Sequence, residues 1–142
     1  MGLLFASALF AQSTTLLNDS YNAAPDSMKA SLQVLAYATG RKVAILGDML
    51  ELGPHEVAFH EEVGRFAASL GLDTLVAVGH RSEALARAAR ESGLGNVFTF
   101  EEAAQVRPRL GELVLPGDTV LLKASRGMHL DTLAQEIGRA VL

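Results

Sequence analysis

Short apolar runs alternate with longer amphipathic segments along almost the whole chain after Gln12. The apolar runs predict strands at residues 13–17, 42–46, 74–78, 97–100 and 119–122. The segments between them carry apolar residues at helical spacing. Because strands that alternate with helices pair in parallel through crossover helices, the sequence predicts a three-layer, doubly wound α/β fold. Its sheet is expected to be mostly parallel and Rossmann-like.

Proline, glycine and serine mark the expected helix ends. Pro25 and Pro54 suit the first turn of a helix, where a missing N–H is no loss. Gly40 is expected to end the helix that follows Pro25, and Ser82 to cap the helix that runs toward residue 92. Pro108 is expected to break or kink the helical segment at residues 101–113.

Length and composition indicate one soluble globular domain. The 142 residues suffice to bury a core, and 49% are hydrophobic against 20% charged. The net charge of -4, without a basic stripe, argues against a nucleic-acid partner. The absence of cysteine excludes disulfides and thiolate sites and fits the cytoplasm.

Residues 1–12 are left without a structural assignment, and residues 13–142 form the predicted domain. The apolar start ends in small residues, as a signal peptide does, but it lacks a positive n-region. Its apolar run is also shorter than the roughly 18 residues of a membrane span, so no membrane partner is expected. We expect a frayed or docking segment at a truncated start.

Ligands of doubly wound sheets collect where loops leave the carboxyl ends of the strands. The first polar loop there, residues 18–27, carries Asp19, Tyr21 and Asn22. An aspartate can accept hydrogen bonds from a ribose, a tyrosine offers a flat face to a base, and an asparagine both donates and accepts. The same residue types also make local turns and helix caps, and the residues alone leave both interpretations open.

The second loop, residues 47–53, carries Asp48 and Glu51 between two glycines. These carboxylates either hold a cation or an amine, or belong to a solvated loop. His55 and His60, which follow, do not have the one-face spacing of a helical zinc motif. No protein-held metal is therefore expected.

The third loop, residues 123–129, carries Lys123, Ser125 and Arg126. Two cations at the start of a helix oppose its dipole, and a bound phosphate or carboxylate would account for them. Arginine can clamp such an anion with two parallel hydrogen bonds. The alternative is a surface turn before the last helix.

Several common motifs are absent from the sequence. It contains no G-x-x-x-x-G-K-[ST] phosphate loop, no G-x-G-x-x-G dinucleotide fingerprint and no G-x-S-x-G nucleophile elbow. No catalytic residue is therefore assigned.

Three segments together resemble the carboxy-terminal domain of the Mur ligases. They are NDSYNAAPDSM, LGDMLELG and KASRGMHLD, in this order along the chain. Folylpolyglutamate synthases share the fold, but the Tyr21–Asn22 pair and the LGDMLELG run resemble the members that add D-alanyl-D-alanine to UDP-MurNAc-tripeptide. The chain departs from the family's usual YNANP at Ala24, where a second asparagine is expected.

The resemblance implies an ADP-forming ligase that works through an acyl phosphate. The complete enzyme would use ATP and Mg²⁺, and its central domain would supply the phosphate loop. This chain would partner the amino-terminal and central domains, hold no cofactor alone and be inactive alone. Asp19 would contact ribose, and Tyr21 and Asn22 would line the adenosine. Lys123, Ser125 and Arg126 would face the phosphate or the dipeptide. Two alternatives remain: a stand-alone module that binds a nucleotide or an anionic peptide, and a structural fragment without a ligand.

Overall fold

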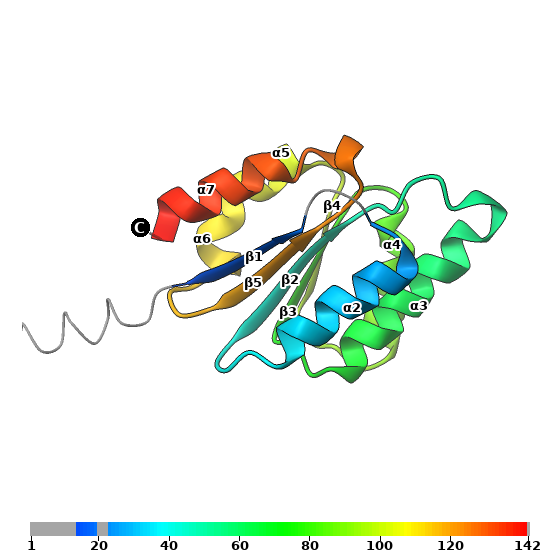
Figure 1. Cartoon of the computed structure of the whole chain (residues 1–142), viewed down its shortest axis with the longest axis horizontal. Coiled ribbons are helices and arrows are strands. Elements are labelled where there is room, and N and C mark those ends of the chain that lie inside the picture. Colours follow the sequence, from blue (N-terminus) through cyan, green and yellow to red (C-terminus); the bar gives the residue numbers. More distant parts are fainter. Residues whose placement is uncertain (1–13, 20–22, 142) are drawn as a thin grey trace, which may run out of the picture.

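The structure is a computed structural model that describes residues 14–19 and 23–141. It contains a five-stranded sheet with the strand order β1-β5-β2-β3-β4 (Figure 1). The strands are β1 (Thr15–Asp19), β2 (Lys42–Gly47), β3 (Thr74–Val78), β4 (Val97–Phe100) and β5 (Thr119–Lys123). Each of the four ladders between these strands is parallel. The predicted doubly wound α/β fold is confirmed.

The apolar strands form because the sheet is covered on both faces. β3 and β5 are buried at every residue and β2 at all but its first, as expected of central strands in a parallel sheet. β1 and β4, at the two edges of the described sheet, are only partly covered. Burial is therefore concentrated in the three middle strands of the described sheet.

Helices cover the two faces separately (Figure 1). One face carries α2 (Pro25–Ala36), α3 (Glu56–Ser69) and α4 (Ser82–Glu91). The other carries α5 (Ala103–Val106), α6 (Leu110–Leu113) and α7 (Asp131–Val141). Alternate residues of one strand therefore enter different cores: Ala44 and Leu46 pack under α2 and α3, whereas Val43 and Ile45 pack under α6 and α7. No helix among residues 14–19 and 23–141 is long and apolar enough to cross a membrane.

Helix boundaries follow the sequence only in part. As expected, Pro108 interrupts its segment, because the 3₁₀ turn Arg107–Arg109 separates α5 from α6. Pro54 lies in the 3₁₀ turn Gly53–His55, so that α3 itself begins two residues later than expected. The prediction that Gly40 ends α2 is wrong. The helix ends at Ala36, and Gly40, with φ +80°, instead shapes the turn that leads into β2.

Candidate functional site

The three polar loops leave neighbouring strands at the same edge of the sheet. β5 lies between β1 and β2, and its last residue, Lys123, is in register with Asp19 on one side and Leu46 on the other. Asp48 and Arg126 follow one and three residues after the ends of β2 and β5. The topology therefore brings the loops together as their positions after the strands predicted.

An ion pair joins the first loop to the third. The ammonium of Lys123 donates to Oδ2 of Asp19, and the hydroxyl of Ser31 donates to the same oxygen at 2.9 Å. The side chain of Lys123 is only 2% exposed, whereas that of Asp19 is 49% exposed. Partial burial raises the pKa of Asp19, but the hydrogen bonds from Lys123 and Ser31 and the Lys123 charge outweigh it, so this pKa is lowered. Asp19 is thus held as a carboxylate with half of its surface open.

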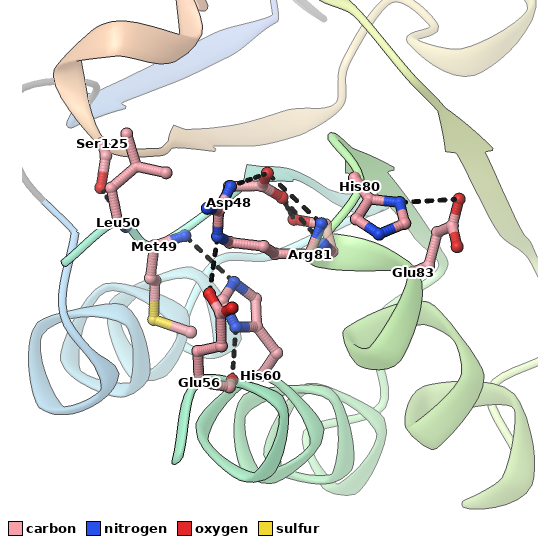
Figure 2. A network of polar contacts seen from close by, with 10 residues as sticks. Asp48, Met49, Leu50, Glu56, His60, His80, Arg81, Glu83 and Ser125 are labelled. Carbon is pink, nitrogen blue, oxygen red and sulfur yellow. Dashed lines mark hydrogen bonds and ion pairs between the residues drawn. The ribbon is translucent and has the colours of Figure 1, made fainter. Parts of the chain in front are cut away.

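The carboxylate of Asp48 is buried and caps a helix. It accepts hydrogen bonds from the Ser82 amide at 2.8 Å and the Ser82 hydroxyl at 2.7 Å. It also accepts one from the amide of Arg81 at 3.3 Å, and Figure 2 shows Arg81 beside it. These amides belong to the first turn of α4, which the helix itself leaves unpaired. The prediction that Ser82 caps α4 is wrong. Ser82 is the first helical residue, and the capping oxygen comes from a loop 34 residues earlier in the chain.

Gly79 makes the close approach of Asp48 possible. It adopts φ +112° at the end of β3, and a Cβ at this position would overlap the carboxylate of Asp48. Only glycine therefore lets the second loop pack against the backbone that precedes α4.

Arg81 connects the same loop to α3. Its Nε donates to Glu56 at 2.6 Å, and its guanidinium lies 3.7 Å from Asp48. The hydrogen bond and the charge of Glu56, with a smaller effect of Asp48, raise the pKa of Arg81. Sequence reasoning missed this residue, although it stands directly before the predicted helix start.

Hydrogen bonds donated by two backbone amides join the second loop to the third. The amide of Leu50 donates to the hydroxyl of Ser125 at 2.9 Å, and the amide of Ser125 donates to the carbonyl of Asp48 at 3.1 Å. A Cβ on Gly47 would lie 2.6 Å from that of Ala124, so these two backbones pass too closely for a side chain. Segments 47–50 and 123–125 therefore behave as one packed unit.

The exposed residues of the loops lie around this unit. Arg126 begins the 3₁₀ turn Arg126–Met128, and its side chain is exposed. Glu51 is also exposed and adopts φ +61°. Tyr21 and Asn22, which were predicted to line the adenosine, lie outside the described residues, as do residues 1–12.

A hollow of about 510 Å³ opens beside the third loop. Glu101 and Glu102 come from the loop after β4, and Arg107 from the 3₁₀ turn after α5. Met128 and His129 come from the turn before α7, and Thr132 from the first turn of α7 itself. Sequence reasoning missed this hollow because residues 101–113 were interpreted only as a helical segment. It offers carboxylates and a guanidinium within one concave surface.

The described residues fit no metal ion. Among residues 14–19 and 23–141, no three carboxylate or imidazole groups cluster at ligand distance. Asp48 caps α4, and His60 uses both ring nitrogens in hydrogen bonds. We therefore assign no magnesium ligand to this part of the chain and derive no step from one.

Sequence comparison relates the chain to cell-wall ligases. Residues 8–126 match the family model described as Mur ligase, glutamate ligase domain. The chain is 38% identical over 136 residues to the UDP-N-acetylmuramoyl-tripeptide--D-alanyl-D-alanine ligase of Escherichia coli strain K12, covering 96% of this chain and 29% of that protein. It is 34% identical over 126 residues to the Bacillus subtilis strain 168 ligase of the same name, covering 87% and 28%. The chain thus spans less than a third of the length of these relatives.

Solved structures of MurF ligases are also similar to this chain. A crystal structure of MurF from Acinetobacter baumannii superposes with a TM-score of 0.76 at 35% identity, covering 89% of this chain and 29% of that one. MurF ligase from Thermotoga maritima, in complex with ADP, superposes with a TM-score of 0.76 at 25% identity, covering 92% and 29%.

Proposed function

Because the chain belongs to the Mur ligase, glutamate ligase domain family, we propose that it is the carboxy-terminal domain of an ATP-dependent ligase. The ligase would join D-alanyl-D-alanine to UDP-MurNAc-tripeptide, the reaction for which the relatives at up to 38% identity are named. The amino-terminal and central domains of such a ligase would be its partners, and the cytoplasm its compartment. The observation that carries the proposal is the meeting of three polar loops at one edge of the sheet.

The proposed reaction needs an enclosed site. The tripeptide carboxylate takes a phosphoryl group from ATP, and the amine of D-alanyl-D-alanine then attacks the acyl phosphate. Collapse of the tetrahedral intermediate forms the peptide bond and releases phosphate. Because water would hydrolyse an acyl phosphate, a domain that closes over the central one protects it. This chain would supply the closing surface, with the phosphate loop and any magnesium ligands on the central domain.

The exposures of the loop residues at this edge of the sheet support different proposed roles for them. Asp19 is half exposed and its carboxylate is fixed by Lys123, so we assign it to the ribose hydroxyls, with Tyr21 and Asn22 beside the adenine. Lys123 is buried and acts through Asp19 rather than on a phosphate directly. Arg126 is exposed and supplies the cation for a phosphoryl or carboxylate group.

The hollow beside the third loop suits the dipeptide. D-Alanyl-D-alanine is a zwitterion, with an ammonium at one end and a carboxylate at the other. Carboxylates from Glu101 and Glu102 and the guanidinium of Arg107 line the hollow, so its two kinds of charge match those of the dipeptide. The volume of about 510 Å³ is ample for a molecule of this size.

Reconstitution tests the proposed function. The chain is mixed with separately produced amino-terminal and central domains of a relative, and ADP release is measured with ATP, UDP-MurNAc-tripeptide and D-alanyl-D-alanine. We expect release that requires all three substrates and both protein parts. Turnover by the chain alone would show that the site is complete without the other domains.

An inactive mixture needs a second measurement. Calorimetry of the chain with ADP then separates a stand-alone nucleotide-binding module, which binds ADP without its partners, from a chain with neither role.

A further inference from the structure

His60 is a buried histidine whose two ring nitrogens both make hydrogen bonds. Its Nε2 lies 3.1 Å from the Met49 amide, and its Nδ1 lies 2.7 Å from the carbonyl oxygen of Glu56 (Figure 2). The Met49 amide can only donate, so Nε2 must be the acceptor. Nδ1 therefore carries the proton and donates to Glu56. These contacts select one tautomer of a neutral imidazole.

The hydrogen bond from Met49 to His60 is one of three that hold residues 48–50 in place. Asp48, Met49 and Leu50 are consecutive, and each is tied to a different part of the fold. The carboxylate of Asp48 caps α4, the amide of Met49 donates to His60 on α3, and the amide of Leu50 donates to Ser125 after β5. His60 thus connects α3 to the second loop, and the second loop in turn bonds Ser125, the residue before Arg126.

We propose that His60 is a positioning residue of this domain, which fixes segment 48–50 and through it the placement of Ser125 and Arg126. The effect of His60 on catalysis rests on the proposed function. The placement itself is a property of the fold. His60 touches no substrate in this arrangement, because it is fully buried on α3 and acts on the third loop through Met49 and Leu50.

A hydrocarbon side chain cannot replace this histidine. Met49 is fully buried, so without Nε2 its amide would face neither a partner nor water. The peptide would rotate to find an acceptor, and the neighbouring Leu50 amide would move with it. The hydrogen bond to Ser125 would then weaken, and the start of the turn Arg126–Met128 would shift.

Three variants separate positioning from packing. His60→Leu keeps most of the volume and removes the acceptor, whereas His60→Gln returns an acceptor oxygen near the place of Nε2. Val63→Ala, one turn along the same buried face of α3, removes core volume but no hydrogen bond to the second loop. It serves as the matched control for lost core volume with the hydrogen bonds of the second loop intact.

Amide hydrogen exchange on the complete chain gives the first readout. In His60→Leu we expect the Leu50 and Ser125 amides to exchange at least about tenfold faster relative to the amide of Ile45 in β2, because local opening no longer requires breaking the Met49 bond. In Val63→Ala this ratio should stay at its wild-type value. An unchanged ratio in His60→Leu overturns the proposal.

Turnover of the reconstituted ligase gives the second readout. His60→Leu should lower kcat by roughly 10- to 100-fold through misplacement of Arg126, with KM for ATP within about twofold of wild type because Asp19 is held separately. His60→Gln should recover most of kcat, and Val63→Ala should keep it. If His60→Leu and Val63→Ala give equal kcat, the catalytic part of the proposal is wrong. If the wild-type mixture has no activity, the proposed function fails, and the exchange ratio alone decides whether His60 positions the loop.

Discussion

Replacement of Asp48 by alanine tests whether this carboxylate belongs to the framework or to a ligand site. Alanine removes the acceptor of three hydrogen bonds, two from Ser82 and one from the Arg81 amide. Ser82 is fully buried, so its amide and hydroxyl would lose their partner without gaining water. The first turn of α4 would begin with unpaired donors in the interior.

The cost can be estimated from these contacts. An orphaned buried donor costs about 1–3 kcal/mol, and loss of a helix cap costs about 1 kcal/mol. The three bonds share one carboxylate, so their contributions are not additive, and the half-exposed guanidinium of Arg81 adds less than about 1 kcal/mol. We expect Asp48→Ala to lower the free energy of unfolding by about 3 kcal/mol. Asp48→Asn keeps one acceptor oxygen and should cost about 1 kcal/mol.

Urea unfolding followed by circular dichroism measures both variants against wild type. The double variant Asp48→Ala/Ser82→Ala should lose less stability than the sum of the single variants, because both remove the hydrogen bond from the Ser82 hydroxyl to Asp48. A loss below about 1 kcal/mol for Asp48→Ala would refute the capping role. The carboxylate would then be available for the cation or amine that its position in the second loop suggested.

Two further predictions concern a helix contact and the edge ion pair. Gly64→Ala should lower the free energy of unfolding by about 1–3 kcal/mol, measured in urea, because its Cβ would overlap the Leu85 carbonyl and this clash outweighs the roughly 1 kcal/mol gain in helix propensity. The control Gly111→Ala has open space around its Cβ and should stabilise the chain or be neutral. Stabilisation by Gly64→Ala would contradict the packing of α3 on α4. Asp19→Asn should destabilise by roughly 1–2 kcal/mol at pH 7, because it leaves the buried Lys123 without its carboxylate. Because the pKa of folded Asp19 is lowered, its contribution to stability is complete above the ordinary aspartate pKa of about 4 and disappears as pH falls through the lower folded value. The stabilities of wild type and Asp19→Asn should therefore converge in acid, and a constant difference between pH 7 and pH 3 would contradict this. Lys123→Met should be less destabilising than Asp19→Asn at pH 7.

The fold was predictable because its strands are local signals. The runs at residues 74–78 and 97–100 became strands with the predicted bounds, and that at residues 42–46 gained only Gly47. Buried parallel strands are continuous apolar runs between polar or glycine-rich turns, so their limits can be recognised within the segment itself. Pro108 was equally informative, because its effect on a helix depends on its own ring.

What the sequence did not reveal has a common cause in contacts distant along the chain. Ser82 has the residue type of a cap, but Asp48 reaches the start of α4 from another loop and takes that role. Lys123 and Asp19 were assigned to different ends of a ligand, yet they pair with each other across 104 residues. Strand order decides both outcomes, and no local pattern in the sequence encodes that β5 inserts between β1 and β2.

Burial divides the polar residues at this edge of the sheet into two groups with different roles. Asp48, Lys123 and Ser125 are buried, and their partners are the α4 start, Asp19 and the second loop. Asp19 and Arg126 stay exposed next to them. An exposed charge can favour a ligand only if it is held in place before the ligand arrives, since the cost of ordering it otherwise reduces the binding energy. The buried residues supply that order, so substitutions there should change how the site is shaped, and substitutions of the exposed residues should change what it binds.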